Sequence, residues 1–166
     1  MIGSHIDETG HPLGIQSHAS AFKNCVRTNL IGVSDIDRER ASNCARMRSI
    51  PFHCVDHLTL LDACRPDIVS VAVPTEVHAA ILSDVIGFPS VRLVICEKPL
   101  TGTTADASVS IEKAAKMKCH LIVNYSRHFL PIMAKIGEKI AVGQIGEIRA
   151  ISGYYTKSIL HNGTHL

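Results

Sequence analysis

Short apolar runs rich in Val, Ile and Leu alternate along the chain with longer stretches whose apolar residues recur at helical spacing. The short runs predict strands over residues 29–35, 52–55, 67–74, 91–99 and 120–126. The amphipathic stretches predict helices over residues 15–24, 37–49, 57–65, 76–87, 105–118 and 130–143. Alternation of apolar and polar residues over 145–158 predicts a further, half-exposed strand.

The order of these elements predicts the fold class. Short strands that alternate with helices indicate βαβ units and a parallel sheet covered by helices on both faces. We therefore expect an α/β fold with a doubly wound, parallel sheet. Such sheets bind ligands at the carboxyl ends of their strands, so the residues that follow each strand are the candidates for chemistry.

Two opposite charges end the predicted strand over residues 91–99. Glu97 and Lys98 follow an apolar run and are followed by Pro99, which restricts Lys98 to extended geometry. An ammonium group at this edge can donate a hydrogen bond to a substrate hydroxyl and stabilise an alkoxide as the proton leaves. The alternative is a salt-bridged strand end with no role in chemistry.

Asp35 is the candidate ligand of a dinucleotide. A carboxylate at the tip of the second strand of such a fold accepts hydrogen bonds from the adenosine ribose and repels a 2′-phosphate, which favours NAD over NADP. Asp37 is expected to cap the following helix. Gly3 could be only the last glycine of a G-x-G-x-x-G turn, whose strand would then precede Met1; an ordinary flexible N-terminus is the alternative.

Two further groups of residues carry candidate chemistry. Pro74 ends a predicted strand and Thr75 could cap the next helix, which leaves backbone N–H groups at the ligand edge. His78, taken alone, is expected on the helix surface. His161 and His165 stand four residues apart, and imidazole is a natural base for a hydroxyl proton. A metal pair would need a third ligand, so no metal is predicted, and surface histidines are the other alternative.

Composition narrows the class of protein. The chain has 166 residues, about one ordinary domain, and is 46% hydrophobic. Its 17 Lys and Arg residues are scattered among 15 Asp and Glu, which argues against a nucleic-acid partner. No run approaches the roughly 18 apolar residues of a membrane span and no signal peptide is found, so a cytoplasmic protein without membrane contact is expected. The six cysteines lack paired spacing and are expected to be reduced and buried.

Seven segments resemble the Gfo/Idh/MocA oxidoreductases, the family of glucose–fructose oxidoreductase and inositol dehydrogenase. In family order they are HASAF, LIGVSDIDRERA, DIVSVAVPTEVHAAI, LVICEKPL, VNYSRHFLP, GQIGEIRAISGYY and HNGTHL. The EKP element and the downstream G-x-H element are the most specific of them. The resemblance implies an NAD(P)-binding Rossmann domain over residues 1–123, incomplete at its N-terminus. It also implies the start of a C-terminal domain for substrate binding and oligomerisation over residues 124–166.

The resemblance also implies an activity, a cofactor and residue roles. The activity is hydride transfer between a nicotinamide cofactor, NAD with NADP possible, and a secondary hydroxyl of a sugar, nucleotide sugar or cyclitol. The partners are a small sugar-like substrate and, at full length, copies of the same chain. Lys98 and His165 match the catalytic lysine and the proton-accepting histidine, with His161 as an orienting group or second relay. The implied cofactor contacts are Gly3, Asp35, Val73, Pro74, Thr75, His78, Glu97, Lys98, Asn124 and Arg127.

Three departures from the family pattern bear on this reading. Many members carry an aspartate where this chain has His161, the first strand with most of its glycine turn is not found, and the sequence stops at Leu166. The first strand is central in the order 3-2-1-4-5-6, so its loss would leave a slot lined by unpaired backbone groups. We therefore expect these 166 residues alone to bind dinucleotide poorly and to turn over nothing. A non-catalytic binding module or degenerate paralogue is the alternative function; the missing glycines favour it, whereas Lys98 and His165 oppose it.

Overall fold

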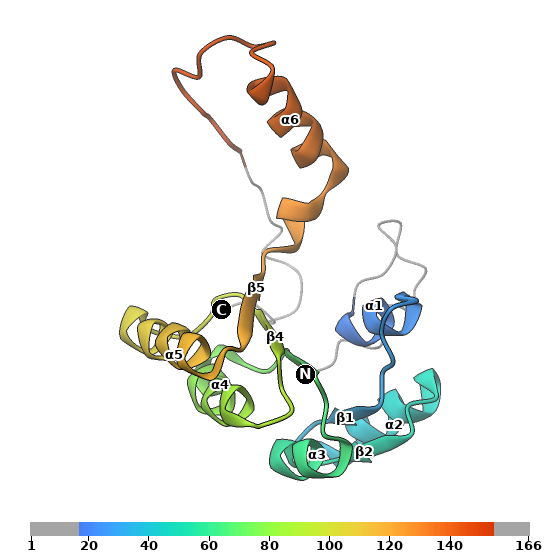
Figure 1. The fold of residues 1–166 in the computed structure, drawn as a ribbon. Coiled ribbons are helices and arrows are strands. Elements are labelled where there is room, and N and C mark those ends of the chain that lie inside the picture. The colour runs from blue at the N-terminus through green and yellow to red at the C-terminus, as the bar shows by residue number, and fades with distance from the viewer. Residues whose placement is uncertain (1–16, 155–166) are drawn as a thin grey trace. The chain divides into compact units, whose positions relative to one another are not determined.

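A computed structural model describes residues 17–154. The chain divides into two compact units, residues 1–125 and 126–166, and each is described by itself. The boundary between these units falls after Tyr125, and the assignment of a cofactor domain and a substrate domain stays a prediction. In the first unit, strands and helices alternate along the chain (Figure 1).

The first unit has parallel strands, as the sequence predicts. They are β1 (Gly32–Ser34), β2 (Phe52–Cys54), β3 (Ile68–Val71), β4 (Leu93–Glu97) and β5 (His120–Asn124). β1 pairs with β2, and β4 lies between β3 and β5 in a second sheet; every one of these pairings is parallel. The register places Glu97 opposite Asn124. The α/β fold class is therefore confirmed, and two polar strand ends meet at one edge.

Two helices connect the two sheets of the first unit. Within residues 17–154 no strand joins β1 to β3, which is the place of the first strand in the order 3-2-1-4-5-6. In α1 (His18–Asn24), Ala19 belongs to the apolar cluster of β1 and α2, while His18 bonds to β3 and β4. In α3 (His57–Cys64), Leu61 belongs to the core around β3 and β4, while Leu60 and Cys64 lie against Gly32 of β1.

Helix caps follow the sequence at most positions. The carboxylate of Asp37 accepts the N–H groups of Glu39 and Arg40 at 2.9 and 3.2 Å, which starts α2 (Arg38–Arg48) as expected. Thr75 was expected to cap the next helix, and this expectation is wrong. A 3-10 turn, η2 (Thr75–Val77), precedes α4 (His78–Gly87), and neither has a side-chain cap. The turn moves the start of the α-helix beyond the reach of the Thr75 hydroxyl.

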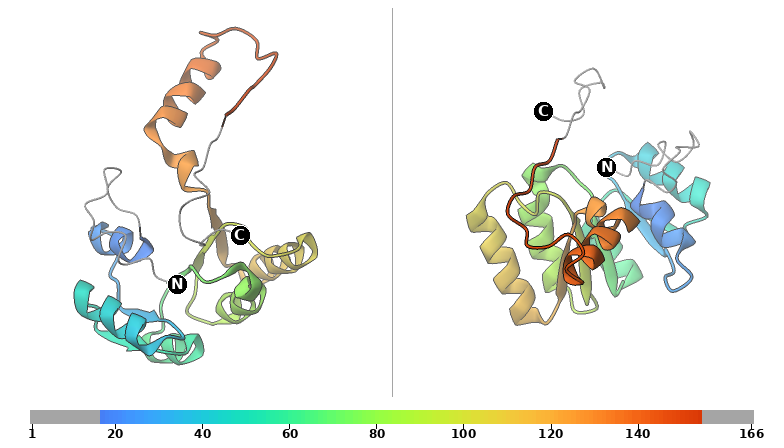
Figure 2. Two further views of the ribbon diagram at one scale, coloured as in Figure 1. Left: turned by 180° about the vertical axis from the view of Figure 1, so that it is seen from behind. Right: turned by 90° about the horizontal axis from the view of Figure 1, so that it is seen from above.

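The larger core lies between the three-stranded sheet and two helices, α4 and α5 (Thr104–Met117), which pack side by side (Figure 2). Its most buried members are Leu61, Val71, Leu82, Val85, Ile86, Val94 and Cys96. All six cysteines are free thiols, as expected. Burial is found for Cys44, Cys96 and Cys119, whereas Cys25 is exposed because it lies at the C-terminal end of α1.

The second unit begins with η3 (Ser126–Phe129) and α6 (Pro131–Ala141). The strand expected over 145–158 is wrong for residues 145–154, which form no strand; the remainder lies outside the described residues. A strand needs a neighbour for its backbone groups, and alternation alone does not supply one. Apolar side chains of α6 are exposed, namely Ile132, Met133, Ile136 and Ile140. No helix in the described part of the chain is both long and apolar enough to cross a bilayer.

Candidate active site

Polar side chains meet at the carboxyl ends of β4 and β5. Glu97 and Asn124 are the last residues of these strands and partners in register. The side-chain amide of Asn124 donates to Glu97 Oε1 at 2.6 Å, and the backbone N–H of Lys98 donates to Glu97 Oε2 at 3.3 Å. The parallel pairing thus delivers a carboxylate and an amide to the edge where such sheets bind ligands.

His18 completes this cluster from the first helix. Its Nε2 lies 2.8 Å from Glu97 Oε1 and 3.3 Å from Asn124 Nδ2, and its Nδ1 bonds to the hydroxyl of Ser70 on β3. Because an ionised carboxylate only accepts hydrogen bonds, Nε2 carries the proton and donates it to Glu97. We call His18, Ser70, Glu97 and Asn124 the edge cluster; it ties α1 to β3, β4 and β5.

The edge cluster keeps Glu97 charged. Burial by itself raises the pKa of the Glu97 carboxyl, but hydrogen bonds from His18 and Asn124 outweigh it and hold this pKa below its usual range. A carboxylate with a lowered pKa is ionised at neutral pH. The site therefore offers an anionic acceptor, which suits a hydroxyl donor on a ligand.

The ammonium group of Lys98 is not used by this cluster. Lys98 is exposed, and among residues 17–154 no hydrogen bond or ion pair to its ammonium is found. Glu97, its neighbour in sequence, pairs with His18 instead. Within the described residues, Lys98 therefore makes no salt bridge at this strand end, and its role toward a ligand stays a prediction.

His78 joins the turns that follow β3 and β4. Its ring is 1% exposed, with Nε2 at 2.9 Å from the carbonyl of Val73 and Nδ1 at 2.9 Å from the carbonyl of Pro99. The expectation of a histidine on the helix surface is therefore wrong, because both ring nitrogens face backbone carbonyls. Pro74 is exposed and Thr75 half-buried in the same turn. That these residues contact a cofactor stays a prediction.

Asp35 stands at the end of β1. Its backbone N–H donates to the carbonyl of Cys54 at 3.3 Å, which continues the parallel ladder. Its Oδ1 accepts the N–H of Asp37 at 2.9 Å, so the half-buried carboxylate is held in one orientation. Its role toward an adenosine ribose stays a prediction.

The remaining predicted site residues do not enter this geometry. Gly3, His161 and His165 lie outside the described residues. Arg127 belongs to η3 in the second unit. In the described ranges, no group of three or more His, Cys, Asp or Glu side chains could hold a metal ion. Because His161 and His165 lie outside the described residues, the pairing of Lys98 with a histidine base stays a prediction.

Two residues of the edge cluster, His18 and Ser70, received no role from the sequence. The signal for Ser70 is a hydroxyl inside the apolar run Ile68–Val71. His18 gave a weaker signal, because a histidine at the start of a helix is common and its partner is 79 residues away.

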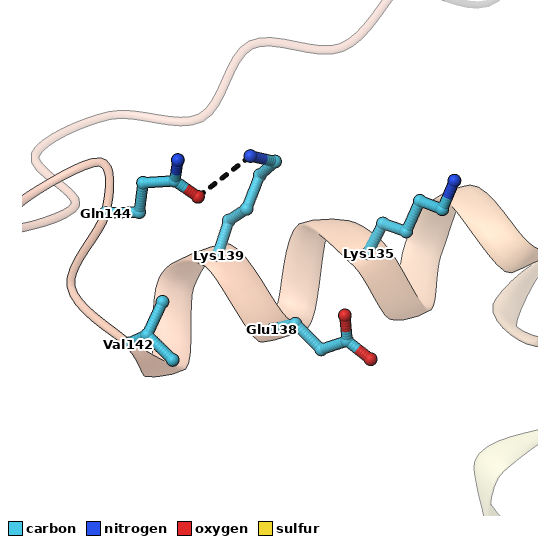
Figure 3. Close-up of a pocket in the computed structure, with 5 residues that line it drawn as sticks. All are labelled: Lys135, Glu138, Lys139, Val142 and Gln144. Atoms are coloured by element: carbon cyan, nitrogen blue, oxygen red, sulfur yellow. Dashed lines mark hydrogen bonds between the residues drawn. The ribbon is translucent and has the colours of Figure 1, made fainter.

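The second unit has a hollow of its own. It is lined by residues of α6 and the turn after it, namely Lys135, Glu138, Lys139, Val142 and Gln144 (Figure 3). The ammonium of Lys139 donates to Gln144 Oε1 at 2.8 Å, which ties the turn to the helix. None of these residues is a predicted site residue.

Comparisons with known proteins match the first unit. A family model described as "Oxidoreductase family, NAD-binding Rossmann fold" matches residues 10–125. The rhizopine catabolism protein MocA of Rhizobium meliloti is 28% identical over 95 residues, 56% of this chain and 29% of that protein. Inositol 2-dehydrogenase 1 of Saccharopolyspora erythraea is 30% identical over 121 residues, 71% of this chain and 35% of that enzyme.

A solved structure of a dehydrogenase is also similar to this chain. The crystal structure of a probable dehydrogenase from Thermotoga maritima is 26% identical, with a TM-score of 0.69 over 78% of this chain and 38% of that one. The chain spans about a third of the length of the curated relatives described above. The family match ends at residue 125, where the first unit ends.

Proposed function

Because this chain belongs to the Gfo/Idh/MocA family of oxidoreductases, which share an NAD-binding Rossmann fold, we propose that Lys98 acts in hydride transfer with a nicotinamide cofactor. The substrate is a secondary hydroxyl of a sugar, nucleotide sugar or cyclitol. The observation that carries the proposal is the edge cluster, in which Glu97 bonds to His18 and Asn124 while Lys98, the next residue, is exposed.

The described residues fit part of a dinucleotide. Two half-buried carboxylates lie at strand ends, Asp35 directly after β1 and Glu97 as the last residue of β4. They suit the hydroxyls of two riboses. Asp35 favours NAD, while NADP is possible. The glycine turn that would hold the pyrophosphate is not among residues 17–154. The cofactor supplies the hydride acceptor; the residues discussed below handle the proton.

In the proposed reaction, the ammonium of Lys98 donates a hydrogen bond to the substrate hydroxyl oxygen and stabilises its developing negative charge. The hydroxyl proton passes to His165, with His161 orienting it or relaying the proton. The C–H bond breaks with its electron pair leaving as hydride, so the alcohol is oxidised to a ketone and one proton is released. The residues of the second unit are proposed to begin a substrate and oligomerisation domain. A cytoplasmic homo-oligomer remains part of the proposal.

The test starts from the open reading frame that encodes these residues, cloned from one stop codon to the next. The product is incubated with NAD or NADP and a panel of sugars, nucleotide sugars and cyclitols, and absorbance is followed at the nicotinamide band. Lys98→Met should reduce turnover by about 10²–10³-fold, the loss typical of one charge-stabilising donor, and leave NAD binding nearly unchanged. Lys116→Met, an exposed lysine on α5, is the matched control and should have no effect.

Two outcomes contradict the proposal in different ways. Equal turnover in Lys98→Met and wild type removes Lys98 from the mechanism. NAD binding without turnover of any substrate favours the non-catalytic binding module.

A further inference from the structure

His18 is placed to control how Glu97 meets a ligand. Its Nε2 bonds to Glu97 on β4 and its Nδ1 bonds to Ser70 on β3. The side chain of His18 is 22% exposed. Residue 18 opens α1, and the next residue, Ala19, is buried in the apolar cluster of β1 and α2. The ring is thus anchored from the helix side as well as from the sheet side.

The two oxygens of Glu97 differ in what they accept. Oε1 receives short hydrogen bonds from His18 and Asn124, at 2.8 and 2.6 Å. Oε2 receives one longer bond from the backbone of Lys98, at 3.3 Å. Each carboxylate oxygen has about two acceptor positions, so Oε1 is filled and Oε2 keeps capacity for a further donor.

We propose that His18 is a positioning residue, which holds Oε1 of Glu97 so that Oε2 faces a hydroxyl group of the bound ligand, the ribose of a dinucleotide. The inference rests on the proposed function, because it takes Glu97 to face the cofactor. Asn124 donates a second hydrogen bond to Oε1 from the neighbouring strand β5. Ser70 on β3 bonds to Nδ1 of His18 and so fixes the plane of the ring.

The hydroxyl of Ser70 can bond to Nδ1 of His18 whether or not that nitrogen carries a proton. A hydroxyl can donate to a bare Nδ1 or accept from a protonated Nδ1, so a rotation of its hydrogen satisfies either state. Nε2 donates to Glu97 in both states. The other titratable side chains beside Glu97 in sequence are Cys96, which is buried, and Lys98, which is exposed; Ser70 and Asn124 bring no charge.

The first experiment needs no cofactor. The product of the open reading frame is labelled with ¹⁵N in histidine and ¹³C in the glutamate carboxyls, with Glu97 assigned through Glu97→Gln. We expect the Nε2–H tautomer for neutral His18. In His18→Gln the Glu97 titration should move to higher pH, because a flexible amide replaces the fixed ring that donates to the ionised form. His53→Gln is the matched control, since His53 is exposed on β2, and should leave the titration unchanged.

Ser70→Ala is the second variant, which keeps the ring of His18 in place. Loss of the Nδ1 partner should leave the Nε2–H tautomer in place, because the ionised Glu97 carboxylate still requires a donor. If His18→Gln fails to fold, this variant decides alone. A neutral Nδ1–H tautomer in the wild type, or a Glu97 titration that is identical in wild type and a folded His18→Gln, overturns the inference. A neutral Nδ1–H tautomer in Ser70→Ala also overturns it.

A second experiment measures NAD binding by titration calorimetry. His18→Gln should weaken binding about tenfold, the cost of roughly one misplaced hydrogen bond, and kcat should fall less than KM for NAD rises. Wild-type affinity in His18→Gln contradicts the positioning role. Absence of NAD binding in the wild type would instead refute the proposed function, and the spectra would still decide the role of His18 toward Glu97.

Discussion

Gly32→Ala is expected to destabilise the first unit, because Gly32 lets helix α3 approach β1 closely. A Cβ atom on residue 32 would lie 2.6 Å from Leu60 Cδ1 and 2.9 Å from Cys64 Sγ. Carbon atoms pack best at roughly 3.5–4.0 Å, so both side chains or the helix must move. Overpacking costs about 1–3 kcal/mol, and the lower backbone entropy of unfolded alanine offsets about 0.5–1 kcal/mol. The expected net loss is therefore about 1 kcal/mol.

A double-mutant cycle tests whether the clash is the cause. Urea unfolding followed by circular dichroism is measured for wild type, Gly32→Ala, Leu60→Ala and the double variant. Removing the Leu60 side chain opens space, so Gly32→Ala should cost less in that background. Gly102→Ala is the control, because a Cβ there meets nothing within 4 Å. The reasoning fails if Gly32→Ala costs the same in both backgrounds, or no more than Gly102→Ala.

Two further predictions concern titration and reactivity. Because the pKa of Glu97 is lowered in the folded state, its ionised form stabilises the fold at pH values above the unfolded-state pKa. This stability is lost as the pH falls through the folded-state pKa. Urea midpoints measured against pH should therefore fall in acid for wild type, and fall less for Glu97→Gln. A wild-type acid limb unchanged by Glu97→Gln would contradict it. Among the thiols, Cys25 should be alkylated first at pH 8, because it is exposed and its pKa is lowered by hydrogen bonds to its thiolate. Cys96 should react only on unfolding, because burial, with a smaller contribution from Glu97, raises its pKa to about 11; peptide mass spectrometry would refute this if Cys96 were labelled in the folded protein.

The strands could be predicted because each is a local apolar run. β4 lies inside the predicted range 91–99, and β5 inside 120–126. Their boundaries were set too wide, since the ladder ends where a partner ends, and that depends on the neighbouring strand. The same reason explains why the strand predicted over residues 145–154 does not form: alternation of apolar and polar residues is a local pattern, whereas a strand needs a distant partner.

The candidate site was harder to predict than the fold. Glu97 and Lys98 could be singled out because the position after a strand in a parallel sheet is known from the sequence order, whereas Asn124 was implied only by the family resemblance. His18 and Ser70 could not be singled out, because their roles in the edge cluster depend on contacts between residues 79 and 52 positions apart in the chain. The expectation for His78 was wrong for a related reason: a ring that lies between two backbone carbonyls looks in sequence like any helical histidine.

The edge cluster explains how opposite charges can stand side by side without neutralising each other. Successive side chains on an extended chain point to opposite faces, so Glu97 and Lys98 are not natural partners despite being neighbours. Glu97 is part-buried and needs donors, which it finds in His18 and Asn124. Within the described residues, Glu97 is therefore held by donors from other elements and makes no ion pair with Lys98. A role of Lys98 toward a substrate stays a prediction.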